Sequence, residues 1–293
     1  MLPNLPAPTF IAEVSSNHHQ DLDRCLAFIK AAHKTGSHAV KFQLFRIDEL
    51  FTPDVLAASP EHRARAEWEL PIAFLPHLAK ASHDLGLLFS CTPFYLEAVA
   101  ALEPHVDFYK IASYELLWDD LLSATAKTGK PVVLSTGMAT QVEIAHAVRV
   151  LKQAGCVELS LLHCVSSYPT PPEHMNLAAI ETLRATFGVT TGLSDHSVSP
   201  AIIARAVHHF NAEIVEYHLD LDGEGEEFAS GHCWLPEQIA TVISDIQTGL
   251  RADGNGIKQP APSELADRDW RADPSDGLRP LKAIRGKDQA NEA

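Results

Sequence analysis

The stretch EVSSNHHQ, residues 13–20, decides between two folds for this chain. It overlaps the end of the apolar run Thr9–Val14, which reads as a first β-strand. An open, doubly wound sheet normally carries a glycine-rich phosphate-binding turn after that strand. Serine, asparagine and histidine occupy the turn here, without glycine. The sequence therefore favours a closed ring of parallel strands, and the number of further strands is the next test.

Short apolar runs alternate with longer helical patterns along the chain, as in βα units around a parallel sheet. The helical patterns include Leu22–Lys34, Pro71–Leu85, Gln141–Ala154, Leu177–Phe187 and Ala201–Phe210. The expected strands are Thr9–Val14, His38–Phe45, Leu87–Thr92, Asp107–Ser113, Pro131–Gly137, Leu159–Ser166, Val189–His196 and Glu213–Asp220. Eight such units predict an α/β fold, the (β/α)8 TIM barrel.

The barrel is expected to span residues 1–250. Residues 251–293 are rich in charge, proline and glycine and show little periodicity, which predicts a tail without an independent fold. Within that tail, Trp270 and Leu278 are the side chains expected to make packing contacts.

Composition narrows the classes of partner. The 293 residues carry 38 acidic and 23 basic side chains, a formal net charge of −15, which argues against nucleic-acid or anionic-membrane surfaces. The five cysteines include no C-x-x-C pair, which fits reduced thiols in a cytoplasmic protein. No basic leader and no apolar run of roughly 18 residues suggests a membrane segment. A small anionic substrate would need a local cationic pocket.

Polar side chains gather where the expected strands end, which in a barrel is the active-site face. Side chains alternate along a strand, so Lys41 shares a face with Gln43, and the same holds for Ser194 with His196 and Glu216 with His218. Lys41 and Lys110 lie in apolar strands and need anionic partners. Either an internal salt bridge to Glu13 or Glu115, or a ligand phosphate, would serve, and the nearby hydroxyls of Ser113, Ser135 and Ser194 favour the phosphate.

Histidines at two neighbouring strand ends predict a metal site. His196 and His218 would bind one divalent ion through neutral imidazoles, with open positions for water or substrate. Such ligands suit Mn²⁺, Fe²⁺, Co²⁺ or Zn²⁺ better than Ca²⁺. Asp195 is expected to orient backbone or a histidine, and the histidines expected to face solvent are His18, His19, His208 and His209.

The strings IAEVSSNH, VKFQ, CTPF, YKIASYE, LSTGM, LLHCVSSYPTP, NLAAI, GLSDHS and EYH occur in order from Ile11 to His218. This set resembles the sialic acid synthase (N-acetylneuraminate synthase) family. The resemblance implies a TIM-barrel transferase that forms a C–C bond between phosphoenolpyruvate and the open-chain aldehyde of N-acetylmannosamine or a related amino sugar. The products would be a nonulosonic acid and phosphate.

The resemblance implies a role for each residue that matches a functional position of the family. Phosphoenolpyruvate would be held by Lys41, Lys110, Ser113, Ser135 and Ser194. The metal, Mn²⁺ with Mg²⁺ or Co²⁺ as alternatives, would be held by His196 and His218. The positions near the sugar and the reacting carbons are Glu13, Gln43, Thr92, Glu115 and Tyr168. Glu13, Lys41, Lys110 and Glu115 form the expected catalytic set, with Glu115 as acid or base for the new hydroxyl and the attacking water.

The sequence departs from the family pattern in three places. Ser166 stands where the family often has an asparagine. After His218, either Glu226 or Glu227 would replace an aspartate that contacts the sugar. The family's C-terminal antifreeze-like domain, which reaches across a dimer with an arginine, is expected to have no counterpart in this sequence, so Arg271 or Arg279 is hypothesised to act in its place. A homodimer is one assembly that the resemblance allows.

Two other functions fit parts of the pattern. A deoxy-octulosonate or deoxy-heptulosonate phosphate synthase would use a phosphorylated aldose and need a second phosphate site, for which only Arg46 lies close behind a predicted strand. A catalytically silent sugar-binding barrel would keep buried lysines and a histidine pair without use, at a cost in stability. A metal-dependent aldolase would have less need for the serines.

Overall fold

The computed structural model describes residues 5–285, and all eight predicted strands form in it. Neighbouring strands pair in parallel in chain order, and β1 also pairs with β8, which closes the ring. The (β/α)8 prediction is therefore confirmed. The strands are β1 Thr9–Glu13, β2 Ala39–Leu44, β3 Leu88–Pro93, β4 Phe108–Ile111, β5 Val132–Ser135, β6 Leu159–Cys164, β7 Thr190–Asp195 and β8 Ile214–Leu219.

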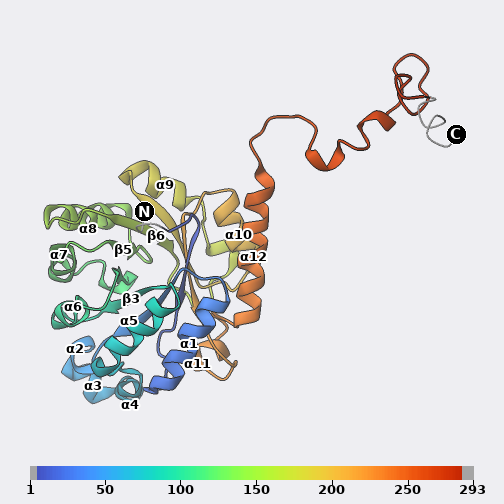
Figure 1. The fold of residues 1–293 in the computed structure, drawn as a ribbon. Helices are drawn as coiled ribbons and strands as arrows, with labels where there is room; N and C mark the ends of the chain where they lie inside the picture. Colours follow the sequence, from blue (N-terminus) through green and yellow to red (C-terminus); the bar gives the residue numbers. More distant parts are fainter. Residues whose placement is uncertain (1–4, 286–293) are drawn as a thin grey trace. The chain divides into compact units, whose positions relative to one another are not determined.

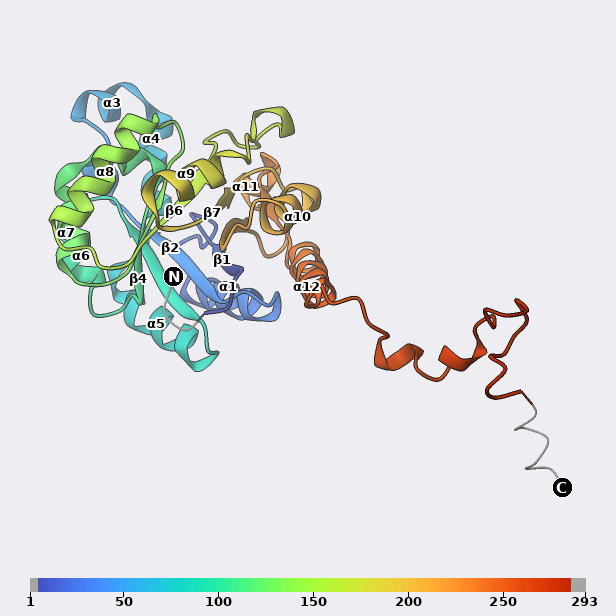
Figure 2. The same ribbon diagram turned by 90° about the horizontal axis from the view of Figure 1, so that it is seen from above.

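Helices surround the strands, as the view in Figure 2 shows. α1 begins after Asp21, whose side chain accepts a hydrogen bond from the Arg24 amide, and α8 begins with a capping box of Thr140 and Glu143. The predicted helix from Pro71 starts later because a 3₁₀ turn precedes it. The main helices are α1 Leu22–Lys34, α5 Leu75–Asp84, α6 Leu96–Leu102, α7 Asp119–Lys127, α8 Gln141–Gln153, α9 Ala179–Phe187, α10 Pro200–His208 and α12 Pro236–Asp253 (Figure 1).

The interior of the barrel has an apolar floor and a polar upper layer. The floor is a buried cluster of Ile11, Ala39, Phe108, Val133, Leu162 and Ile214. Two positions further along their strands, and therefore on the same face, stand Glu13, Lys41, Lys110, Ser135, Cys164 and Glu216. Burial of the floor holds the strands together, and the polar layer above it is left for chemistry.

Two irregular segments rise from the strand ends. The β2–α5 insertion, residues 45–74, contains the short helices α2 Ile47–Leu50, α3 Pro53–Ala58 and α4 Pro60–Ala64 and the 3₁₀ turns Arg65–Trp68 and Ile72–Phe74. The β8 loop, residues 220–232, contains α11 Glu226–Ala229 and leads into a short strand, β9 Cys233–Trp234. β9 pairs in parallel with the end of β8, His218 opposite Cys233.

The chain divides into two compact units between Gly249 and Leu250, next to the boundary expected at residues 250 and 251. In the second unit, Asp276 forms ion pairs with Lys282 and Arg285. Trp270 and Leu278 are 54% and 63% exposed, so neither anchors a core of its own.

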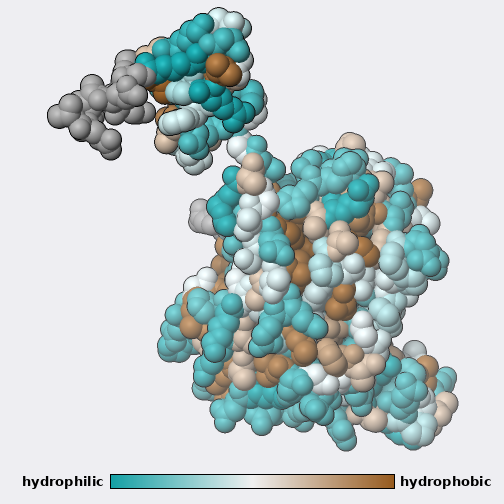
Figure 3. All heavy atoms as spheres, turned by 90° about the vertical axis from the view of Figure 1, so that its right-hand side faces the viewer, coloured by the Kyte–Doolittle hydropathy of each residue, from teal (hydrophilic) through white to brown (hydrophobic). Residues whose placement is uncertain are grey.

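Much of the molecular surface is hydrophilic (Figure 3). On the face seen in Figure 3, hydrophilic side chains predominate, with apolar ones between them. Among residues 5–285, no helix combines the length and apolarity needed to cross a bilayer.

Gly192 on β7 is expected to be essential for barrel closure. A Cβ there would lie 2.1 Å from the backbone oxygen of Ile214 on β8, which cannot swing away. We expect Gly192→Ala to lower the free energy of unfolding by about 3 kcal/mol or more, measured by denaturant titration. Gly86→Ala, at φ +75° with open space around its Cβ position, is the control and should cost about 1–2 kcal/mol. Equal costs for the two variants would contradict this account.

Candidate active site

The C-terminal ends of the strands open into a cavity of about 640 Å³. Eleven of the thirteen residues predicted for the site line it: Glu13, Lys41, Gln43, Lys110, Ser113, Glu115, Ser135, Tyr168, Ser194, His196 and His218. The other two are not in its wall. Thr92 lies buried beside Lys41 and accepts a hydrogen bond from it, and the Ser166 hydroxyl lies 3.9 Å from the Cys164 thiol.

Both buried lysines are paired with carboxylates from other strands. Lys41 contacts Glu13 and lies 3.9 Å from Glu216. Lys110 lies 3.1 Å from Glu216. Burial opposes ionisation of Glu216, but Lys110 and Lys41 lower its pKa to about 2. The internal salt bridges that the sequence left open thus form, although the partner of Lys110 is Glu216 and not Glu115, and a large cavity remains above them.

Glu115 is the carboxyl group without such compensation. It is 8% exposed, and burial raises its pKa to about 8 against the opposing effect of Lys110. Its Oε2 is buried, and no group in the described part of the chain hydrogen bonds to it. Glu115 is therefore a neutral acid at pH 7, able to donate a proton into the cavity.

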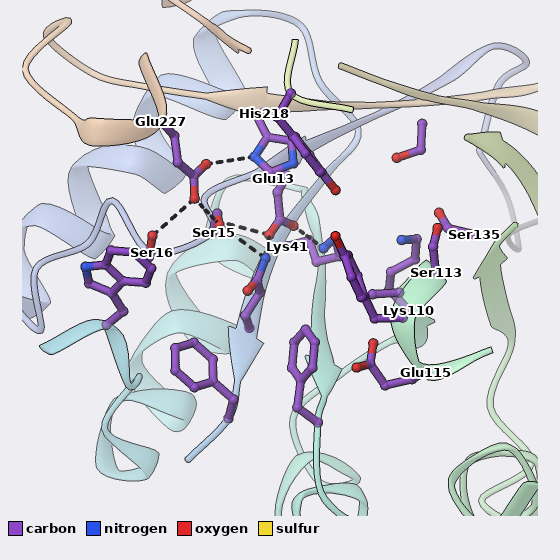
Figure 4. A pocket seen from close by; sticks show the side chains of 18 of the residues that line it. Glu13, Ser15, Ser16, Lys41, Lys110, Ser113, Glu115, Ser135, His218 and Glu227 are labelled. Carbon is purple, nitrogen blue, oxygen red and sulfur yellow. Dashed lines mark hydrogen bonds and ion pairs between the residues drawn. The ribbon is translucent and has the colours of Figure 1, made fainter. Parts of the chain in front are cut away.

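Hydroxyl groups line the cavity beside Lys110, as Figure 4 shows for Ser113 and Ser135. The Ser113 hydroxyl accepts a hydrogen bond from the Gly137 amide at 2.9 Å. The Ser135 hydroxyl is buried and has no partner within residues 5–285, so it is free for a ligand oxygen. A Cβ at Gly137 would lie 2.3 Å from the Ser166 hydroxyl and 2.8 Å from that of Ser113, so a larger residue there would displace both hydroxyls.

The two predicted imidazoles lie next to one another, edge to face, in the cavity wall. The ring centroids of His196 and His218 are 5.2 Å apart, and Tyr168 lies 4.2 Å from His196. His196 Nδ1 donates to the Val165 carbonyl oxygen at 3.0 Å, which leaves the lone pair on Nε2. Burial lowers the pKa of His196 and keeps it neutral, as a metal ligand must be.

Glu227 of the β8 loop connects His218 to the segment that follows β1. Its carboxylate accepts hydrogen bonds from His218 Nδ1 at 2.8 Å and from the hydroxyls of Ser15 and Ser16 (Figure 4). His232 Nε2 lies 3.5 Å away. Burial opposes ionisation of Glu227, yet these contacts hold its pKa well below the usual value. Glu227 lines the cavity, whereas its neighbour Glu226 is exposed.

These donors fit a divalent ion. One ligand atom from each of His218, Glu227, His232 and Cys233 lies within 4.8 Å of the others, although burial raises the pKa of Cys233 and keeps it a thiol. His196 stands outside this group but adjoins His218. Imidazole and carboxylate donors match the preferences of Mn²⁺, Co²⁺ and Zn²⁺. His218 belongs both to this four-residue group and to the predicted pair of His196 and His218.

Some sequence expectations need correction. His18 was expected to face solvent but is fully buried, with its pKa lowered to about 4 by that burial. His19, His208 and His209 are exposed, and Asp195 accepts hydrogen bonds from the Ser197 amide and hydroxyl, as expected. Arg271 and Arg279 belong to the second unit, and their hypothesised role stays a prediction.

Several cavity residues had no role assigned from the sequence. Alternation did place Glu216 beside His218, and that was the one available signal. Ser15 and Ser16 lie in an irregular segment, where no periodicity predicts direction, and so does His232, which adjoins Glu227 outside the cavity lining. The same holds for the wall built by the β2–α5 insertion, which comprises Phe45, Leu50, Phe51, His62, Arg65 and Trp68.

Ionic groups, a neutral carboxylic acid and imidazoles at the C-terminal mouth of a closed barrel define a TIM-barrel enzyme. The model of the NeuB family matches residues 28–258. The chain therefore belongs to the NeuB family of sialic acid synthase-type enzymes, and the resemblance noted from its motifs is confirmed.

Similar proteins agree with this assignment. An uncharacterized protein of Methanocaldococcus jannaschii is 38% identical over 88% of this chain and 75% of its own length. An N,N'-diacetyllegionaminic acid synthase of Campylobacter jejuni is 32% identical over 87% and 80%. The crystal structure of an N-acetylneuraminic acid synthetase from Leptospira borgpetersenii, in complex with citrate, has a TM-score of 0.79 at 31% identity and covers 91% of this chain and 94% of that one.

Removing Lys110 should leave the buried carboxylate of Glu216 with less compensating charge and so destabilise the protein. Lys110→Met leaves Glu216 with the Ser194 hydroxyl and the more distant Lys41, at 3.9 Å, and we expect the free energy of unfolding at pH 7 to fall by about 3–5 kcal/mol. The double variant Lys110→Met/Glu216→Gln should recover part of that loss in denaturant titrations. Because the pKa of folded Glu216, about 2, lies below its unfolded value, the wild-type contribution is present above pH ~4.5 and lost as the pH falls towards 2. Unchanged stability of the single variant would refute the charge-compensation account.

Proposed function

We propose that the protein condenses phosphoenolpyruvate with an N-acetylated amino sugar in its aldehyde form, giving a nonulosonic acid and phosphate. The observation that carries the proposal is the pairing, in one cavity, of two buried lysines and an unpartnered serine hydroxyl with a buried neutral carboxylic acid. Family membership supports the same reaction, and the relative named for N,N'-diacetyllegionaminic acid supports an N-acylated acceptor.

The phosphate of phosphoenolpyruvate would lie against Lys110 and the hydroxyls of Ser113, Ser135 and Ser194. Hydroxyl donors and ammonium groups together suit an anion with several oxygens. Lys41 and Lys110 keep their carboxylate partners in the free protein, so both ammonium groups are held in position before the ligand binds. Phosphate that departs later in the reaction would leave from the same donors.

His196 and His218 would hold the divalent ion, Mn²⁺ with Mg²⁺ or Co²⁺ as alternatives, and Glu227 would orient His218. When bound, such an ion supplies Lewis-acid polarisation of a carbonyl oxygen. In both rings Nδ1 carries the proton, because it hydrogen bonds to the Val165 carbonyl oxygen in His196 and to the Glu227 carboxylate in His218. The unprotonated Nε2 of each ring is therefore the atom that would bind the ion.

Glu115 would supply the proton. As C3 of phosphoenolpyruvate bonds to the aldehyde carbon, the aldehyde oxygen becomes a hydroxyl and needs one proton. Water then adds at C2, and phosphate leaves from that carbon. A carboxylic acid that is still protonated at pH 7 can give its proton in the first step and, as a carboxylate, accept one from the water in the second.

The proposed reaction predicts release of inorganic phosphate from phosphoenolpyruvate. We expect release in the presence of Mn²⁺ with N-acetylmannosamine or a related N-acetylated hexosamine, and its loss when a chelator is added. Aldose phosphates form the comparison arm. Release with aldose phosphates alone would select the deoxy-octulosonate or deoxy-heptulosonate type of reaction, and no release with any aldehyde would support a silent barrel.

The raised pKa of Glu115 predicts how kcat changes at alkaline pH. The acid form is lost as the pH rises through about 8, so kcat should fall there. Glu115→Gln cannot transfer a proton and should lower kcat by roughly 10²–10⁴-fold, with no such fall in its residual rate. The exposed Glu97 on α6 offers a control, Glu97→Gln, that changes the net charge equally and should keep the wild-type profile. A Glu115→Gln enzyme with the wild-type profile would assign the proton to another group.

A further inference from the structure

One wall of the cavity is built by aromatic side chains rather than by the strand-end charges. Phe45, Phe51 and Trp68 come from the β2–α5 insertion, and Phe94 follows β3. Phe45 and Phe94 meet edge to face, with ring centroids 6.1 Å apart. Such a wall offers apolar contact to a ligand whose reactive end lies among the lysines and histidines.

A single guanidinium group, Arg65, is set into this wall. Its Cζ lies 5.3 Å from the ring centroid of Trp68 and 5.8 Å from that of Phe51. Contact with two rings restricts the guanidinium and leaves its N–H groups available as donors. Arg65 is thus held in a defined orientation before any ligand arrives.

The Nε group of Arg65 is buried and without a partner among residues 5–285. Within residues 5–285, its one ion pair joins the terminal NH2 group to Glu61, at 3.8 Å, and the Glu61 side chain is 80% exposed. That pair is weak, since water screens an exposed carboxylate. A buried N–H donor costs free energy unless it is satisfied, so the cavity lacks one hydrogen-bond acceptor at this position.

We propose that Arg65, with Phe51 and Trp68, recognises the N-acyl group of the acceptor sugar. Arg65 Nε donates to the acyl carbonyl oxygen, and the rings contact the acyl methyl group. This inference rests on the proposed function and names the part of the acceptor that the chain selects. It also places the selecting arginine in the barrel unit itself, in contrast to the hypothesis for Arg271 or Arg279.

A sugar phosphate fits the same position less well. A phosphate group presents three oxygens and prefers several donors, whereas His62, which lines the same cavity, has its Nδ1 engaged at 2.7 Å with the Ser59 hydroxyl. Arg46, the other arginine of the insertion near a strand end, stacks on Tyr95 at 5.1 Å and lines a different cavity. A methyl group also gains from aromatic rings, and a phosphate does not.

The test compares Arg65→Gln with Arg46→Gln. Both variants remove one positive charge from the insertion. Arg65→Gln also removes two cation–π contacts and Arg46→Gln one, but of the two arginines only Arg65 lines the cavity. For Arg65→Gln we expect kcat/KM for N-acetylmannosamine to fall roughly 10–150-fold, with KM for phosphoenolpyruvate unchanged. Mannose, which lacks the acyl group, should lose little. Arg46→Gln should behave as wild type with both sugars.

Binding gives a readout that does not depend on turnover. Titration calorimetry of the phosphoenolpyruvate-loaded protein should show tighter binding of N-acetylmannosamine than of mannose, and Arg65→Gln should abolish the difference. Equal wild-type affinities, or equal losses for both sugars, would overturn the proposal. If no acceptor releases phosphate, the proposed function fails, while the binding difference still decides the role of Arg65.

Arg65→Lys separates acyl from phosphate recognition. Lysine keeps the charge but lacks the planar Nε donor, so an acyl site should lose most of its selectivity, whereas a phosphate site should keep much of its affinity. Selective loss with N-acetylmannosamine 6-phosphate, sparing the unphosphorylated sugar, would assign Arg65 to a phosphate and overturn the acyl proposal. Unchanged thermal melting of each variant would exclude misfolding as the cause.

Discussion

Compensation of two buried lysine charges is the constraint on which the rest of the site depends. Glu13 stands opposite Lys41 in the register of β1 and β2, so local pairing supplies one partner. Glu216 lies on β8, the last of the eight barrel strands, yet it contacts Lys110 on β4 and approaches Lys41 on β2. Only closure of β1 onto β8 allows this, because an open sheet would hold β8 far from β2. The fold and the charge balance therefore support each other.

The same cavity keeps two buried carboxyl groups in opposite protonation states. Glu216 contacts one ammonium group and lies near the other, and it stays ionised far below neutrality. Glu115 has no such contact, and burial keeps it protonated at pH 7. Both residues are buried glutamates, so the difference in their pKa values comes from how close each lies to a lysine. One carboxyl group balances charge, and the other is left able to transfer a proton.

Much of the regular structure could be predicted from the sequence, because burial leaves a periodic record there. Every strand was found, since barrel strands read as short apolar runs. α1 was predicted residue for residue, because Asp21 begins it and an apolar stripe continues to its end. Two-residue alternation also placed Lys41 with Gln43 and His196 with Ser194 on the inner face, and all four line the cavity. Where periodicity exists, a side chain's direction follows from its position.

The remaining residues of the site lie where no such period operates. Glu226 and Glu227 are adjacent in a loop, and the sequence alone does not distinguish them. Glu227 is selected by its hydrogen bonds to Ser15 and Ser16, more than two hundred residues earlier in the chain, and to His218 at the end of β8. His18 follows a strand and has no local sign of burial, yet it packs against Phe42. Arg65 reads as one more charge in a polar helical segment until the insertion brings Trp68 and Phe51 against it. The strands thus position the reacting groups, whereas the irregular segments contribute contacts that only the assembled fold defines. Members of one barrel family can therefore differ in these segments, and so in substrate, while keeping the same chemistry.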